Sequence, residues 1–244
     1  MDILIFGAHP DDIELCCGGT VKKLTNDGHS VTLVDLTRGE MGTRGTPELR
    51  QKEAKKASQL LGVENRVNIG LPDGGLYNNA EYRIPIIKVI RTFQPHICFI
   101  TAPEDRHPDH THATELLIDA IYFSGLKNIE TLDGDNNPQE KWRPHHVLHY
   151  MQDRPFEPDL VVDITETLQD KIDAVLAYGS QFNVPDEQGE ETYISSSRFF
   201  NNIEARARHY GHLISTEFGE PFKYQGGPIP VQDFSLFEQS APKR

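Results

Sequence analysis

Short apolar runs alternate with helical patterns along the first half of this chain. Runs rich in β-branched residues predict strands at residues 3–6, 31–36, 66–69 and 97–101. Apolar residues that recur every three or four positions predict helices between and after these strands, at residues 13–24, 46–61, 84–93 and 116–121. Strands that alternate with helices at this spacing indicate βαβ units with right-handed crossovers. We therefore predict an α/β fold with a mostly parallel sheet flanked by helices.

The second half of the chain is less regular. The polar stretch 127–144 is typical of a surface loop, and two strands (147–151, 160–164) and two helices (168–178, 198–213) follow it. Beyond residue 218 glycine and proline are frequent, so we expect an irregular tail, with a neighbouring subunit as a candidate packing partner. Because 244 residues suffice for one large core, we predict a single domain, with its core at 2–215 and a C-terminal extension at 216–244.

Composition narrows the class of protein. The formal net charge of −13 argues against nucleic acid or an anionic membrane surface as the main partner, because both would be repelled. We see no basic leader at the N-terminus, and no apolar stretch approaches the roughly 18 residues of a membrane span. Cys16, Cys17 and Cys98 are typical of small buried side chains in a reducing compartment. These features predict a cytoplasmic enzyme that has no membrane or nucleic-acid partner.

Two polar clusters follow predicted strands. Residues 9–12 (His-Pro-Asp-Asp) come directly after the first strand, and residues 107–110 (His-Pro-Asp-His) come after the strand that ends near Thr101. Ligands of open α/β sheets bind outside the carboxyl ends of the strands. We therefore expect both clusters at one rim of the sheet, in contact if their strands are near neighbours.

The residue types in these clusters suit a catalytic metal site. Zinc hydrolases use three protein ligands and leave a position for water. His9, Asp12 and one histidine of the second cluster would supply such a set, and the spacing leaves open which histidine binds. Asp11 would then stand beside the metal, placed to take a proton from water.

A simpler interpretation is that these carboxylates cap helices. Asp11, Asp12 and Asp109 all stand at predicted helix starts, where acidic side chains are favourable. A lone His-x-x-Asp or His-x-x-His pattern would be weak support for a metal site. The pairing of two clusters at strand ends favours the metal site. Gly18 and Gly19, inside the first helix, favour a close approach of backbone or ligand.

The clusters and their flanks resemble a known family. Residues 7–14 (Gly-Ala-His-Pro-Asp-Asp-Ile-Glu), 18–20 (Gly-Gly-Thr) and 107–110 together look like the PIG-L/LmbE-like deacetylases, over residues 2 to about 215. The chain is more closely similar to the N-acetylglucosaminyl-malate deacetylases of bacillithiol biosynthesis. That similarity is carried by residues 36–46, 48–50, 71–76 and 177–182. Cys16 and Cys17 depart from relatives, which usually carry small residues there.

The resemblance implies a Rossmann-like fold and a metal centre. Zn²⁺ would be held by His9, Asp12 and His110, with Asp11 as general base. Imidazole and carboxylate ligands also suit Fe²⁺ or Mn²⁺, which the sequence does not distinguish from zinc. By analogy with relatives, we also expect a homo-oligomer, such as a hexamer.

The same resemblance assigns supporting roles. His107 would stand beside the oxyanion, and Asp109 would orient His107 and fix its protonation state. Arg50 and Asp73 fall at the family's sugar-binding positions, although Arg50 is also interpretable as a solvated first-turn arginine and Asp73 as a turn former. Tyr193 corresponds loosely to a mobile family tyrosine that closes over the site.

Together these features predict a zinc-dependent hydrolase that removes the acetyl group from a small GlcNAc conjugate. The most specific expectation is conversion of GlcNAc-malate to GlcN-malate. Alternatives are an amidase of thiol S-conjugates and a deacetylase of another GlcNAc compound such as a chitin disaccharide. A nucleotide-binding module would require Gly-x-Gly-x-x-Gly after the first strand, where this sequence has His-Pro-Asp-Asp. A non-catalytic zinc site would require a fourth ligand, and the two motifs contain none.

Overall fold

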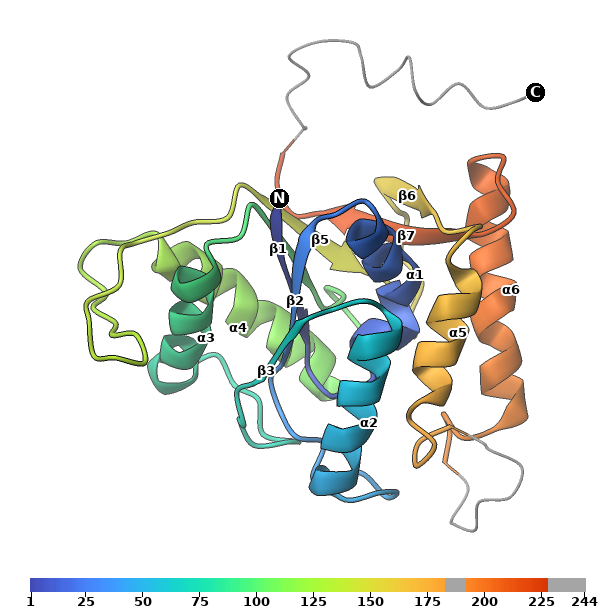
Figure 1. Cartoon of the computed structure of the whole chain (residues 1–244), viewed down its shortest axis with the longest axis horizontal. Coiled ribbons are helices and arrows are strands. Elements are labelled where there is room, and N and C mark those ends of the chain that lie inside the picture. The colour runs from blue at the N-terminus through green and yellow to red at the C-terminus, as the bar shows by residue number, and fades with distance from the viewer. Residues whose placement is uncertain (183–191, 228–244) are drawn as a thin grey trace.

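Seven strands form one sheet within residues 1–182 and 192–227, the part of the chain that this computed structural model describes (Figure 1). Their order is β3-β2-β1-β4-β5-β7-β6, and neighbours are parallel except that β7 is antiparallel to both β5 and β6. The strands are β1 (Asp2–Gly7), β2 (Ser30–Asp35), β3 (Asn65–Asn68), β4 (Ile97–Ile100), β5 (His146–Tyr150), β6 (Leu160–Asp163) and β7 (Gly219–Tyr224). The predicted α/β fold with a mostly parallel sheet is confirmed.

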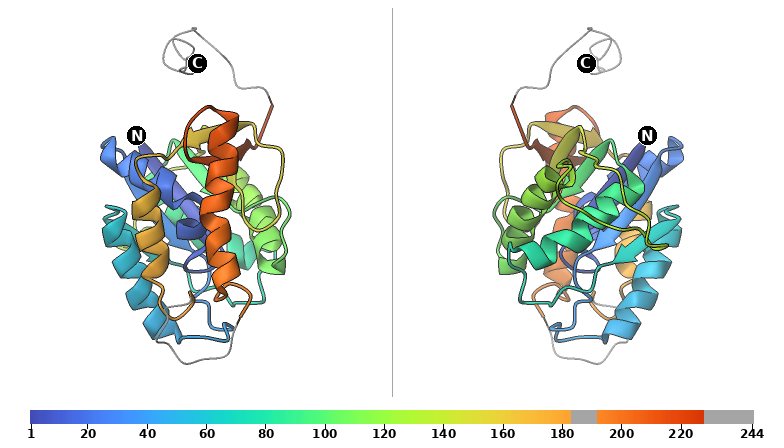
Figure 2. Two further views of the ribbon diagram at one scale, coloured as in Figure 1. Left: turned by 90° about the vertical axis from the view of Figure 1, so that its right-hand side faces the viewer. Right: turned by 90° about the vertical axis from the view of Figure 1, so that its left-hand side faces the viewer.

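Helices cover both faces of this sheet (Figures 1 and 2). Their bounds are α1 (Asp12–Asn26), α2 (Pro47–Leu60), α3 (Ala80–Phe93), α4 (Pro108–Ser124), α5 (Leu168–Leu176) and α6 (Ser197–Leu213). One face carries α1, α2, α5 and α6, and the other carries α3 and α4. Each helix and each of the first six strands overlaps a segment predicted from the hydrophobic pattern.

Strand β1 shows why the sheet is buried on both sides. Its side chains alternate between two cores: Ile3 and Ile5 pack with the α1 side, while Leu4 and Phe6 pack with the α3 and α4 side. A strand with apolar residues at successive positions can lie only in the middle of such a three-layer structure. Accordingly β1 is central and pairs with β2 on one side and β4 on the other.

This pairing places the two polar clusters together. After β1 the chain builds outward through β2 and β3, then returns to add β4 on the other side of β1. Such a reversal of strand order opens a crevice at the carboxyl ends of the two central strands, where α/β proteins bind ligands. The expectation that the clusters share one rim is therefore met, because β1 and β4 are direct parallel neighbours.

The expected irregular tail is wrong for residues 219–224. These residues form β7, which inserts between β5 and β6, with Leu148 opposite Tyr224 and Val161 opposite Pro221. Glycine and proline around Phe218 are typical strand breakers, and the partners of β7 lie far away in the sequence. The sheet thus extends into the segment that the sequence assigned to the C-terminal extension. The part of the tail beyond residue 227 lies outside the described residues.

Helix α1 is kinked near its start, and a residue of β7 binds the backbone N–H groups just after the kink. Cys17 has non-helical dihedral angles (φ −139°, ψ 21°), so the helix bends there. The buried Glu220 carboxylate accepts hydrogen bonds from the backbone N–H groups of Gly19 (3.1 Å) and Thr20 (2.7 Å), and Lys171 Nζ lies 2.5 Å from it. A Cβ at Gly19 would lie 2.9 Å from the side chain of Ile164, which precedes α5. The close approach expected at Gly19 is therefore the tight packing of α1 against this segment.

Two further expectations concern the cysteines and membrane-spanning helices. Cys16, Cys17 and Cys98 are buried free thiols, as expected of small apolar side chains. Among residues 1–182 and 192–227, no helix is both long and apolar enough to cross a membrane.

Candidate metal centre and its pocket

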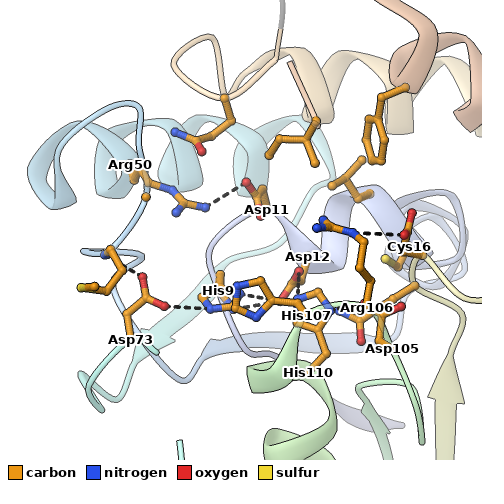
Figure 3. A pocket seen from close by; sticks show the side chains of 18 of the residues that line it. His9, Asp11, Asp12, Cys16, Arg50, Asp73, Asp105, Arg106, His107 and His110 are labelled. Carbon is orange, nitrogen blue, oxygen red and sulfur yellow. Dashed lines mark hydrogen bonds and ion pairs between the residues drawn. The ribbon is translucent and has the colours of Figure 1, made fainter. Parts of the chain in front are cut away.

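The first cluster is built by a sharp turn between β1 and α1. Asp11 lies in the left-handed region (φ 108°), which costs a residue with a Cβ free energy, and its side chain makes no capping hydrogen bond. The next carboxylate, of Asp12, accepts a hydrogen bond from the backbone N–H of His9 at 2.8 Å. The interpretation of Asp11 as a helix cap is therefore wrong, and the turn instead directs its side chain toward Arg50 in the pocket (Figure 3).

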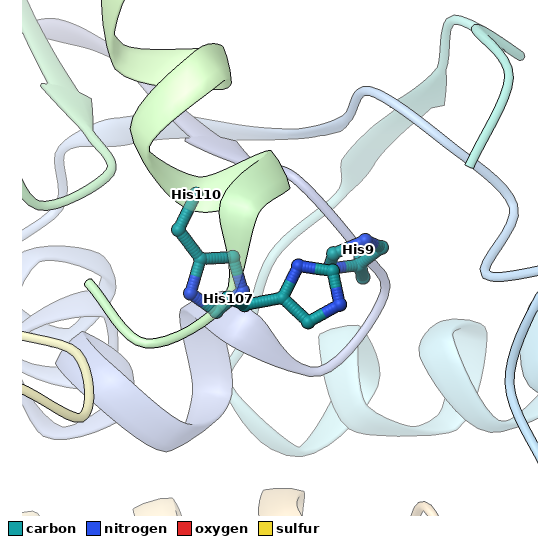
Figure 4. A group of neighbouring side chains, drawn as sticks. All are labelled: His9, His107 and His110. Carbon is teal, nitrogen blue, oxygen red and sulfur yellow. The ribbon is translucent and has the colours of Figure 1, made fainter. Parts of the chain in front are cut away.

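The second cluster is a regular helix start. His107 is the N-cap of α4, Pro108 occupies the first turn, and the His107 Nδ1 accepts a hydrogen bond from the backbone N–H of Asp109 at 3.2 Å. His110, three residues on, therefore lies on the same side of the helix as His107, and their ring centroids are 5.0 Å apart. Both rings lie close to the ring of His9, which belongs to the turn after β1 (Figure 4).

Asp12 joins the two clusters. One of its oxygens lies 3.2 Å from His110 Nε2 and the other 3.5 Å from His9 Nδ1. Burial alone would raise the pKa of Asp12, but His110 and His9 outweigh it and hold this pKa well below its usual range. The carboxylate is therefore kept as an anion between two imidazoles.

His110 and His9, the two histidines in contact with Asp12, bind protons strongly. Burial opposes the charged ring, yet contact with Asp12 and Asp105 raises the pKa of His110 to about 9. The pKa of His9 is likewise raised, against burial, by Asp109, Asp12 and Asp73. A buried group that favours protons in this way also favours a metal cation, which would take their place.

The donor set fits a divalent metal. Ligand atoms of His9, His107 and His110 lie within 4.8 Å of one another, as do those of His9, Asp73 and Asp109. The set expected from the family, with Asp12 in place of His107, offers two imidazoles and one carboxylate. The geometry is compatible with that set, because Asp12 contacts both His9 and His110 directly, while Asp73 and Asp109 lie on the Nε2 side of His9. Which of these groups binds the metal stays a prediction.

Asp105 is a member of the site that the sequence analysis missed. Its Oδ2 lies 2.6 Å from His110 Nδ1, and its Oδ1 accepts a hydrogen bond from the backbone N–H of Arg154 at 2.8 Å. A carboxylate on Nδ1 fixes the ring and leaves Nε2 directed at Asp12. The only signal in the sequence was an acidic residue shortly before the second cluster, and this carries no recognisable spacing.

The structure gives Asp109 a different neighbour from the one expected. Its carboxylate accepts a hydrogen bond from the backbone N–H of Gly74 at 2.7 Å and lies 3.4 Å from His9 Nε2. Only its backbone N–H contacts His107. The carboxylate therefore contacts His9, and the expected role of Asp109 in orienting His107 stays a prediction.

His107 is set up as a hydrogen-bond donor. Because Nδ1 accepts from the backbone, the proton of the neutral ring resides on Nε2. Burial, followed by the nearby His9 and His110, lowers the pKa of His107, which favours this neutral form. The arrangement is the one needed to donate to a developing oxyanion.

Arg50 is a buried partner of Asp11 and not a solvated arginine. It is 5% exposed, its Nη2 lies 2.8 Å from Asp11 Oδ2, and Nη2 also donates to the Pro10 carbonyl. Gly39 makes room for it: a Cβ there, where φ is +68°, would lie 2.0 Å from Arg50 Nη1. Burial raises the pKa of Asp11 to about 7, with Arg50 opposing this rise and Asp12 adding to it.

Asp73 and Tyr193, the two other residues expected to bind substrate, differ from each other in location. Asp73 lies in the pocket, with Oδ1 at 3.0 Å from His9 Nε2 and Oδ2 accepting from the Met41 N–H at 2.8 Å, so both oxygens already have partners. Tyr193 is 53% exposed, donates to Asp153 at 2.9 Å and stacks under Arg106. It thus contacts two residues that line the pocket, while its closing motion stays a prediction.

Comparison with known proteins supports the resemblance. The model of the GlcNAc-PI de-N-acetylase family (PIG-L) matches residues 4–121. A diacetylchitobiose deacetylase of Thermococcus kodakarensis is 31% identical over 237 residues, which cover 92% of this chain and 83% of that protein. A probable N-acetyl-alpha-D-glucosaminyl L-malate deacetylase 2 of Bacillus cereus is 28% identical over 195 residues, covering 73% and 83%. The crystal structure of the conserved protein TT1542 from Thermus thermophilus matches with a TM-score of 0.82 and 36% identity, covering 96% and 97% of the two chains.

Proposed function

The chain belongs to the GlcNAc-PI de-N-acetylase (PIG-L) family, and on that premise we propose that it is a zinc-dependent hydrolase of N-acetylglucosamine compounds. The bond cleaved is the amide that joins the acetyl group to the sugar nitrogen. The observation that carries the proposal is the position of Asp11, a carboxylate held by Arg50 at 2.8 Å in the same pocket as the cluster of His9, Asp12 and His110. This juxtaposition supplies a base next to a metal-binding group.

His9, Asp12 and His110 would hold the metal, and their residue types equally suit Fe²⁺ or Mn²⁺. When bound, Zn²⁺ supplies Lewis-acid chemistry that makes water more acidic and polarises a carbonyl. Asp105 keeps His110 in the required orientation, with 2.6 Å between Oδ2 and Nδ1. Asp109 and Asp73 do the same for His9 from its Nε2 side.

The other residues handle protons and charge. Asp11 accepts a proton from the water that attacks the acetyl carbonyl carbon. His107 donates its Nε2 proton in a hydrogen bond to the carbonyl oxygen as negative charge develops there. The C–N bond then breaks, and the protonated Asp11 delivers its proton to the leaving sugar amine, which leaves acetate and a free amine.

We propose GlcNAc-malate as the substrate, with GlcN-malate and acetate as products. This assignment rests on the segments shared with the GlcNAc-malate deacetylases and on the similarity to the probable enzyme from Bacillus cereus. A second candidate is a diacetylated chitin disaccharide, which is favoured by the 31% identity to the deacetylase of Thermococcus kodakarensis.

The test is acetate release by the purified chain. The protein is stripped with a chelator, reloaded separately with Zn²⁺, Fe²⁺ or Mn²⁺, and assayed on GlcNAc-malate, diacetylchitobiose and an S-conjugate amide. We expect turnover of at least one GlcNAc compound, dependent on metal, and the highest kcat/KM on GlcNAc-malate. Failure of the metal-loaded chain to release acetate from any GlcNAc compound would refute the proposal. A preference for the disaccharide would change the assigned substrate and leave the proposed deacetylase activity standing.

A further inference from the structure

The pocket has two ends, one on each side of the histidines. Figure 3 shows Arg50 and Asp73 on one side of the cluster and Cys16 with Arg106 on the other. We assign the first end to the sugar, because the family resemblance implies sugar-binding roles for Arg50 and Asp73. The second end contains a positively charged side chain that takes no part in the proposed reaction.

That cation is Arg206 of α6, which lines the pocket, is half-buried and lies close enough to Cys16 to interact electrostatically with its thiol. The other two arginines of the pocket have acidic partners: Arg50 Nη2 lies 2.8 Å from Asp11, and Arg106 Nε lies 3.2 Å from Asp153. Arg206 donates to the backbone carbonyl of Gln152, and no carboxylate of residues 1–182 or 192–227 pairs with it. A guanidinium has five N–H donors, so most of its hydrogen-bonding capacity is unused within these described residues.

Gln152 adds a second unused donor to the same wall. Its side chain is 2% exposed, and its Oε1 accepts a hydrogen bond from the Ala102 N–H at 3.0 Å, which assigns Nε2 to the opposite branch of the amide. Nε2 is buried and has no partner within the described residues. Buried donors are normally satisfied, so an unsatisfied one in a pocket wall is available to an acceptor on a bound ligand.

The surroundings would strengthen a bond to an anion. Leu15, Ile194 and Phe199 line the pocket together with Arg206, and apolar neighbours exclude water and so strengthen a charge pair. The chain as a whole has a net charge of −13, so a local unpaired cation is needed to hold an anionic ligand. The planar fork of a guanidinium matches the two oxygens of a carboxylate.

We propose that Arg206 is a specificity-determining residue that binds a carboxylate of the substrate, with Gln152 as a supporting donor. The enzyme thereby selects GlcNAc conjugates whose aglycone is anionic over neutral ones. This inference rests on the proposed deacetylase function and deepens it, because it assigns a chemical class to the group attached to the sugar.

The test compares two substrates that share one sugar. GlcNAc-malate carries carboxylates, and the methyl glycoside of GlcNAc does not. We expect Arg206→Met to lower kcat/KM on GlcNAc-malate by roughly 10- to 100-fold, mostly through KM, since a charge-assisted hydrogen bond is lost. On the methyl glycoside the change should stay within about threefold, and Arg206→Lys should recover part of the loss.

The matched control is Arg208→Met, two residues along α6. Arg208 is solvent-exposed and pairs with Glu204 and Glu217, away from the pocket, so both substrates should keep their wild-type kinetics. An equal fall on both substrates in Arg206→Met would overturn the proposal, because it would assign Arg206 a structural role through the Gln152 carbonyl. Unchanged kinetics on both would overturn it too.

Equilibrium binding separates this inference from the proposed function. If the metal-loaded wild type turns over neither substrate, the proposed function fails. Calorimetric binding of the same two compounds to wild type and Arg206→Met still decides the role of Arg206. Weaker binding of GlcNAc-malate alone supports it, and equal binding to both proteins contradicts it.

Discussion

The two clusters have nearly the same sequence and different backbones, and their tasks differ accordingly. In the first, the positive φ of Asp11 turns two adjacent carboxylates in different directions, Asp11 toward Arg50 and Asp12 toward the histidines. In the second, a regular helix start places His107 and His110 on one side of α4. A strained turn separates neighbouring side chains, whereas a helical turn brings residues three apart together. The first cluster therefore divides metal binding from base chemistry, and the second presents two imidazoles at once.

Loss of Asp12 would break the contact between the clusters and should have the largest effect. Asp12→Ala removes the carboxylate that touches both His9 and His110, so we expect zinc content to fall to background and acetate release with it. Elemental analysis of the purified protein measures this. Asp27→Ala, an exposed position just after α1, is the control and should keep its metal. Full zinc content in Asp12→Ala would instead indicate that the three histidines hold the metal.

Asp11→Asn tests the division of labour within the first cluster. The amide keeps the size of the side chain but accepts no proton from water, so we expect kcat to fall by about 10²- to 10⁴-fold. Zinc content should stay at the wild-type level, in contrast to Asp12→Ala. Wild-type turnover in this variant would remove Asp11 from the role of base.

His107→Phe tests the second cluster as a donor to the oxyanion. The ring is retained and the Nε2 proton is lost, so kcat should fall by about 10²- to 10³-fold. Metal content and KM should change little, because His110 is the ligand of that helix. A parallel loss of zinc would show that His107 binds metal and would favour the group of three histidines.

Asp105→Asn should have the smallest effect of the four changes. It weakens the support of His110 Nδ1, and loss of such a partner typically lowers metal affinity by about 10- to 100-fold. Competition with a chromogenic chelator measures the affinity. The neighbouring exposed residue provides the control, Glu104→Gln, which should bind zinc as the wild type does. If both variants match the wild type, Asp105 does not hold His110 in the metal-bound enzyme.

The sequence predicted most of the fold because hydrophobic spacing is a local signal. Buried parallel strands and helix caps such as Thr46, whose hydroxyl accepts from the Leu49 N–H at 3.2 Å, are visible within a few residues. Strand β7 was missed because Gly219 and Pro221 disfavour strands locally, and only pairing with β5 and β6 overrides them. Its formation depends on partners that lie far away in the chain.

The site likewise has parts that the sequence predicted and parts that it did not. Both clusters were found from the sequence, since each stands directly after a strand. Their partners were not found. Asp105 reaches His110 through the path of the loop after β4, and the Asp109 carboxylate that contacts His9 is also bound by the backbone N–H of Gly74, far away in the sequence. Burial of Arg50 likewise depends on the absence of a Cβ at Gly39. These contacts arise from tertiary structure and leave no spacing signature.

The late position of β7 has a consequence for biosynthesis. In the sheet order β6 is joined to the other strands through β7, and Glu220 of β7 reaches back 201 residues to the Gly19 N–H. A nascent chain therefore presents residues 9–12 first but lacks the strand that anchors α1 until residues 219–224 have been translated. Such high contact order slows folding and lengthens the time for which β6 and one edge of β5 remain unpaired. We expect the emergence of β7 from the ribosome, more than the appearance of the metal ligands, to set when the metal centre assembles.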